Sequence, residues 1–170
     1  MKSIRVITLL IGLGCFGCEQ GSPADSFVGT WRLVSWEQAD ASGEAIYPYG
    51  EVPEGQLVYT SEGQMSAHLM NPGASLADAT ASGAEEIIGQ AMRGYFAYYG
   101  TYTVDASAGT VTHRVRGSLA PTWIGTDQVR AFEFLDGNRL QLSAALREDD
   151  NVARATGTRG RQVLVWERIE

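Results

Sequence analysis

Hydrophobic and polar residues alternate in many short segments of this chain. An apolar residue at every second position is typical of a β-strand with one buried face. In the first such segment, Gly29, Trp31, Leu33 and Ser35 share one face. Turn-forming residues such as Gly, Asp and Ser separate the segments, which indicates tight connections between antiparallel strands. The segments with this pattern are 27–36, 55–60, 64–70, 97–104, 110–116, 128–134, 139–143 and 163–168.

One stretch has a helical period instead. Apolar side chains recur at Ile87, Ile88, Ala91, Met92 and Tyr95, which is the spacing of one face of a helix. Two glutamates at the start of this stretch suit the positive end of a helix dipole. The pattern predicts one short helix over about residues 84–94, and the two-residue period resumes after it.

The strand count and the turns favour an all-β fold. We predict an antiparallel up-and-down β-barrel of about eight or nine strands, formed by residues 26–170 as one domain. Gly29 allows another part of the chain to come close, and Trp31 points to the same face two residues on. A large side chain in that place can plug one end of a small barrel, so Gly29 and Trp31 are expected to have a structural role at the barrel floor.

Residues 1–17 have the pattern of an export signal. Two basic residues lie among the first five, and residues 6–14 are an apolar run that is too short to span a bilayer stably. The sequence therefore predicts an exported protein that reaches the periplasm or the periplasmic face of a membrane in the cell envelope.

A glycine precedes each of the two cysteines, Cys15 and Cys18. Gly before Cys resembles the signal of a bacterial lipoprotein, in which the cysteine becomes the lipidated first residue. Cys18 is the preferred lipidation site because the polar tether of residues 18–25 follows it. Cys15 remains an alternative, and so does an ordinary cleaved signal. We expect membrane contact only through this N-terminal lipid anchor.

Composition narrows the function. The chain has 170 residues, 44% of them hydrophobic, which fits one globular domain. It has 13 Lys and Arg against 20 Asp and Glu, and its net charge of −7 gives no basic surface for nucleic acid. Lys2 is the only lysine and lies in the predicted leader, so a lysine Schiff base and a phosphate-loop lysine are excluded from the domain.

No motif indicates a metal site or a cofactor. His68 and His113 are the only histidines, and their spacing matches no metal-ligand pattern. The chain also lacks Gly-x-Ser-x-Gly, His-Glu-x-x-His and a glycine-rich phosphate loop. We therefore predict no metal, no cofactor and no catalytic residue.

Several stretches, in order along residues 26–169, resemble the bacterial lipocalin-like domain proteins, relatives of the calycin barrels. The resemblance implies a β-barrel with an internal cavity and implies little about function. A helix before Tyr98 departs from outer-membrane lipocalins, which place their helix near the C-terminus. The matching stretches are 29–35, 47–50, 63–67, 98–102, 109–113, 125–132 and 164–168.

Two polar residues fall on faces that are expected to point inward. His113 lies between Val111 and Val115, and Arg130 shares its face with Phe132. Buried polar groups of this kind need partners, and a ligand is one possible partner. The candidate ligand-binding residues are His113, Arg130, Tyr99, Tyr102 and Phe132.

Structural roles are the simpler alternative for these residues. Arg130 could lie over Trp31 at the floor, an arrangement that lipocalins use. His113 could be a core histidine that Tyr99, Tyr102 or a backbone carbonyl satisfies.

Three functions remain open on this reading. The preferred one is a lipid-anchored protein that binds a small apolar or amphipathic molecule in its barrel. The second is a barrel-enclosed cyclase or isomerase in which His113 or a tyrosine acts as acid or base. The third is a structural envelope lipoprotein without a ligand, which would have a filled core. The oligomeric state stays open.

Overall fold

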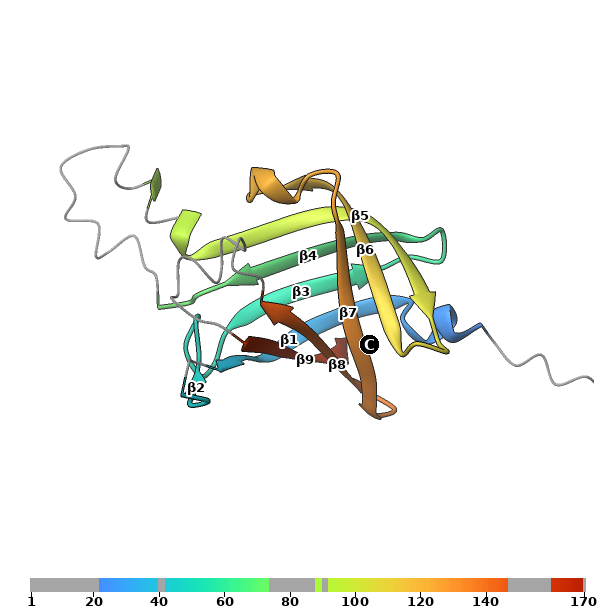
Figure 1. The fold of residues 1–170 in the computed structure, drawn as a ribbon, viewed down its shortest axis with the longest axis horizontal. Coiled ribbons are helices and arrows are strands. Elements are labelled where there is room, and N and C mark those ends of the chain that lie inside the picture. Colours follow the sequence, from blue (N-terminus) through green and yellow to red (C-terminus); the bar gives the residue numbers. More distant parts are fainter. Residues whose placement is uncertain (1–21, 40–41, 74–87, 90–91, 147–159, 170) are drawn as a thin grey trace, which may run out of the picture.

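The computed structural model describes residues 22–39, 42–73, 88–89, 92–146 and 160–169. Within these ranges, nine antiparallel strands form one sheet, and the pairing of the first strand with the last closes it into a barrel (Figure 1). The predicted all-β antiparallel barrel is confirmed. The strands are β1 (Gly29–Ala39), β2 (Ala45–Ile46), β3 (Glu54–Tyr59), β4 (Gln64–Met70), β5 (Tyr95–Asp105), β6 (Thr110–Ser118), β7 (Asp127–Asp136), β8 (Arg139–Leu146) and β9 (Gly160–Ile169).

Eight of these strands make the barrel wall, and β2 is an extra strand. It pairs only with the last residues of β1, at Gln38 and Ala39. The other connections join neighbouring strands in sequence order, as expected for an up-and-down barrel. The interior therefore collects every second residue from eight strands, which is why the core is rich in aromatic and branched side chains.

A β-bulge changes the inward face of β1. Its register against β9 shifts between Leu33 and Ser35. Trp31 and Leu33 are buried before the bulge, and Trp36 is buried after it. The prediction that Ser35 continues the Trp31 face was therefore wrong, because one extra residue in a strand moves all later side chains to the other face.

One end of the barrel is closed by the segment that precedes β1. The 3-10 turn η1 (Pro23–Ser26) leads to Phe27, whose side chain is 0% exposed. The Phe27 ring packs edge-on against Tyr59 and Phe132, at centroid distances of 5.4 and 4.9 Å. Figure 1 shows η1 at one end of the barrel, beside the start of β1. The end of the predicted tether is thus part of the barrel floor.

The predicted helix over about residues 84–94 lies largely outside the described residues. Residues 88–89 and 92–93 have helical conformation, and Gly94 is a bend directly before β5. The second 3-10 turn, η3 (Pro121–Trp123), connects β6 to β7. The leader, Cys15 and Cys18 also lie outside the described residues. No helix in the described ranges has the length and apolar character needed to cross a bilayer.

Candidate functional site

The floor of the barrel is built around Trp31. Its indole Nε1 donates to the Phe27 carbonyl at 2.9 Å, and its side chain is 0% exposed. The guanidinium of Arg168, on β9, lies 4.1 Å from the centroid of the Trp31 ring. Arg168 also donates to the carbonyls of Val28 and Ser26, at 2.6 and 2.7 Å. Arg130 is elsewhere, so the alternative that placed Arg130 over Trp31 was wrong and Arg168 has that position.

Gly29 is required by the same arrangement. Its backbone has φ +141°, a conformation that residues with a side chain rarely adopt. A Cβ at Gly29 would also lie 2.6 Å from Nη1 of Arg168. The Gly29-x-Trp31 pattern thus leaves space for the arginine that stacks on the tryptophan, which is a structural role.

Above the floor, His113 lies inside the barrel, as predicted from its alternation with Val111 and Val115. Its side chain is 0% exposed. Nε2 lies 2.7 Å from the Tyr59 hydroxyl, and Nδ1 lies 2.8 Å from the Tyr98 hydroxyl. Burial, together with the positive charge of Arg130, lowers the pKa of His113 to about 3. The ring is therefore neutral at neutral pH, and both of its nitrogens have a partner.

The tyrosines that bind His113 differ from those predicted. Tyr99 is 59% exposed on the outside of β5, and the Tyr102 hydroxyl donates to the Thr60 carbonyl at 3.0 Å. Tyr99 and Tyr102 are three residues apart, so the two-residue repeat of a strand puts them on opposite faces. On β5, Tyr98 and Tyr102 point inward and Tyr99 points outward. The sequence alone does not show which of the two faces of β5 lies inside the barrel.

Arg130 points into the barrel from β7 and is 7% exposed. Its guanidinium lies 5.6 Å from the centroid of the Trp123 ring, and Nη1 donates to the Val129 carbonyl at 3.3 Å. Burial raises the pKa of Tyr98, and the nearby positive charge of Arg130 partly offsets this rise. In the part of the chain that the structure describes, no carboxylate forms an ion pair with Arg130.

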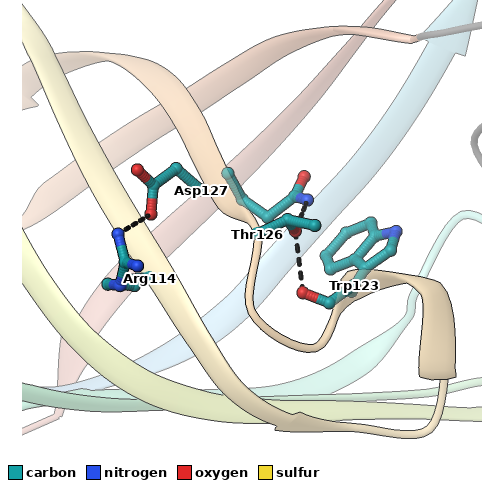
Figure 2. Close-up of polar contacts among 5 residues, drawn as sticks. Arg114, Trp123, Thr126 and Asp127 are labelled. Atoms are coloured by element: carbon teal, nitrogen blue, oxygen red, sulfur yellow. Dashed lines mark hydrogen bonds and ion pairs between the residues drawn. The ribbon is translucent and has the colours of Figure 1, made fainter.

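Trp123 is fixed in position by the turn that follows η3 (Figure 2). Thr126 Oγ1 donates to the Trp123 carbonyl at 2.7 Å, and Gln128 Nε2 donates to Thr126 Oγ1 at 2.9 Å. Outside this turn, Arg114 and Asp127 form an exposed ion pair at 3.4 Å. The turn thus holds the indole ring between Arg130 and the aromatic rings of Tyr98 and Phe96, at 5.4 and 5.1 Å between centroids.

A cavity lies between these side chains. The volume of its confined part is about 40 Å³. All of the empty space, including open solvent at the mouth, is about 480 Å³. The first volume describes the confined part, so a larger ligand needs side-chain movement or extends toward the mouth. The lining residues are Trp36, Leu57, Ala67, Leu69, Phe96, Tyr98, Trp123, Arg130, Leu142, Gln162, Leu164 and Trp166.

Of the five candidate ligand-binding residues, the cavity wall includes Arg130. His113 lies behind Tyr98 and does not line the cavity. Tyr102 and Phe132 pack against Phe27 at the floor. Sequence reasoning missed Tyr98 and Trp123, although the alternation that makes Tyr102 inward also makes Tyr98 inward. Within the described ranges, no three His, Cys, Asp or Glu side chains are grouped as a metal site would require.

A closed barrel that is plugged at one end, with an aromatic cavity and one buried cation, has the architecture of barrels that bind small molecules. The chain belongs to the lipocalin-like domain family, whose model matches residues 28–169. A relative in Aspergillus oryzae (strain ATCC 42149 / RIB 40) is the 4'-hydroxy-3'-methoxypropiophenone carrier protein ppsC. It is 34% identical over 113 residues, which are 62% of this chain and 96% of the relative. A solved redesigned β-barrel covers 86% of this chain and 95% of its own, with TM-score 0.43 and 10% identity.

Proposed function

We propose that this protein binds a small apolar or amphipathic aromatic molecule in the cavity beside Arg130 and Trp123. The observation that carries the proposal is the buried guanidinium of Arg130, which lines an aromatic cavity and has no carboxylate partner among the described residues. A buried cation without a counterion is costly, and a polar ligand group would offset that cost. The relative that carries a substituted propiophenone supports an aromatic ligand of similar size.

The two other functions have less support. His113 is separated from the cavity by Tyr98, and its low pKa keeps the ring neutral at neutral pH, so it is a poor general acid and a weak general base. A purely structural lipoprotein would have a filled core, whereas this core contains a cavity with a polar group in its wall.

Export and lipid anchoring through Cys18 are also part of the proposal. Their support is the leader pattern of residues 1–17 and the glycine before the cysteine. A ligand-binding barrel attached to the cell envelope would act as a carrier or reservoir for molecules that dissolve poorly in water.

The binding test uses 4'-hydroxy-3'-methoxypropiophenone as the probe, measured by calorimetry with the domain 22–170. Because a hydrogen bond from a charged donor contributes about 1.5–3 kcal/mol, Arg130→Met should weaken binding about tenfold or more. The matched control is Arg116→Met, since Arg116 is an exposed arginine on β6. Equal loss in both variants, or no binding by the unmodified domain to this probe and its close analogues, would refute the proposal.

A further inference from the structure

The hydrogen bonds between Tyr59, His113 and Tyr98 have a direction that their partners determine. The Tyr59 hydroxyl is buried, and among the described residues its one hydrogen-bond partner is Nε2 of His113. A phenol has one proton to donate. If Tyr59 only accepted, this proton would be buried without an acceptor, which is unfavourable. The Tyr98 proton differs, because Tyr98 lines the cavity and can donate this proton to a ligand there, whereas Tyr59 does not line it. Tyr59 is therefore the residue that donates to Nε2.

The tautomer of His113 follows from this assignment. A neutral imidazole has one N–H group and one nitrogen lone pair. Since Nε2 accepts from Tyr59, the proton is on Nδ1, and Nδ1–H donates to the Tyr98 hydroxyl oxygen at 2.8 Å. The low pKa of His113 means that this neutral form persists through neutral pH.

Tyr98 then has a donor that remains unused. Its oxygen accepts from Nδ1 of His113. Its own proton has no acceptor among the described residues, and Tyr98 lines the cavity. Trp36 and Trp166 also line the cavity, and the buried Nε1–H of each has no acceptor within the described part of the chain. The cavity is therefore rich in hydrogen-bond donors.

Acceptors are scarce in the same wall. Among the described residues that line the cavity there is no carboxylate, and Gln162 is the one whose side chain carries a carbonyl oxygen. We propose that the cavity prefers aromatic ligands that carry a carbonyl oxygen. This oxygen would accept hydrogen bonds from Tyr98 and Arg130. His113 acts as a positioning residue that turns the Tyr98 proton toward the ligand. This inference rests on the proposed function, because it specifies the ligand of the same cavity.

The direction of the network can be measured without any ligand. In ¹⁵N-labelled protein, protonated and unprotonated imidazole nitrogens resonate far apart, and the spectrum of the His68→Gln variant assigns His113. We expect a protonated Nδ1 and an unprotonated Nε2 between pH 5 and 8. A protonated Nε2 would reverse the chain of donors and overturn the inference.

Selection is tested with two ligands of nearly the same shape, propiophenone and propylbenzene, which lacks the carbonyl oxygen. We expect the ketone to bind at least tenfold more tightly than the hydrocarbon. Tyr98→Phe should reduce this ratio about fivefold or more, because it removes a hydrogen bond that only the ketone can accept. The control is Tyr102→Phe, which removes a hydroxyl at the floor that does not line the cavity.

The outcomes separate the two proposals. Equal affinity for both ligands would overturn acceptor selection and leave the proposed function intact. If neither ligand bound, the proposed function and acceptor selection would both fail, and only the hydrogen-bond direction seen in the NMR spectrum would stand.

Discussion

The guanidinium of Arg168 lies 4.1 Å over the ring of Trp31 and joins the last strand of the barrel to the first. Its two donors also reach the carbonyls of Val28 and Ser26 in the segment that closes the floor. One side chain thus connects three parts of the chain, and this makes the floor a sensitive place for substitutions.

Arg168→Lys should destabilise the protein by about 2 kcal/mol, because a lysine keeps the charge but cannot stack on Trp31 and form both hydrogen bonds. Urea denaturation followed by tryptophan fluorescence measures the change. Arg114→Lys is the matched control, since Arg114 makes an exposed ion pair with Asp127, and its cost should stay within about 0.5 kcal/mol. Similar costs for both substitutions would show that the stacking contributes little.

Gly29→Ala should cost more than Gly109→Ala. Both glycines have positive φ, +141° and +63°, so each alanine brings backbone strain of about 1 kcal/mol or more. Only at Gly29 does the new Cβ also meet Arg168, at 2.6 Å, whereas nothing lies within 4 Å of it at Gly109. Thermal and urea unfolding should therefore give the larger loss for Gly29→Ala. Equal losses would mean that Arg168 moves away without cost.

Stability should fall in acid because of His113. Its pKa is near 6.5 when unfolded and about 3 when folded, so between these values the unfolded chain binds the extra proton. The free energy of unfolding then falls as pH falls, by up to about 1.4 kcal/mol per pH unit from this group. His113→Gln should have a shallower pH dependence than the unmodified protein, and His68→Gln should retain the full slope. Identical slopes in all three proteins would contradict the buried neutral state of His113.

Cys18→Ala should abolish lipid attachment if Cys18 is the processing site. Intact mass of the protein purified from cell envelopes would then show a lipid on the unmodified chain and on Cys15→Ala, but not on Cys18→Ala. If the lipid were lost only in Cys15→Ala, Cys15 would be the lipidated residue and the prediction for Cys18 would be wrong. A chain without lipid in every case would leave only a cleaved export signal.

The fold was predictable because strand alternation and turn residues are local features. The period of two along β6 placed His113 inside, and the same rule placed Arg130 and Phe132 on the inner face of β7. Register is not local. The bulge between Leu33 and Ser35 that turns Trp36 inward depends on the pairing of β1 with β9, which is 130 residues away in the sequence.

The candidate site was predicted less completely. Arg130 was found, but its tryptophan partner is Trp123 in a connecting turn and not Trp31. The sequence cannot show which tryptophan lies near which arginine, because these distances depend on how the barrel closes. Tyr98 and Tyr99 are adjacent, and nothing in the composition of β5 indicates which of them faces the interior. The cavity itself is a property of packing, and no single segment predicts it.

The position of η1 also determines how an anchored molecule would be oriented. Trp31, near the start of β1, is bonded to Phe27 at the floor beside η1, while Trp36, five residues later on the same strand, lines the cavity. Figure 1 shows β1 running away from η1. Cys18 precedes Pro23 by five residues, a chain that spans at most roughly 18 Å. A lipid on Cys18 would keep the floor close to the bilayer and the cavity distal to it. The ligand would then enter the cavity from the aqueous compartment. A ligand passed from this cavity to the membrane would first have to be released into water.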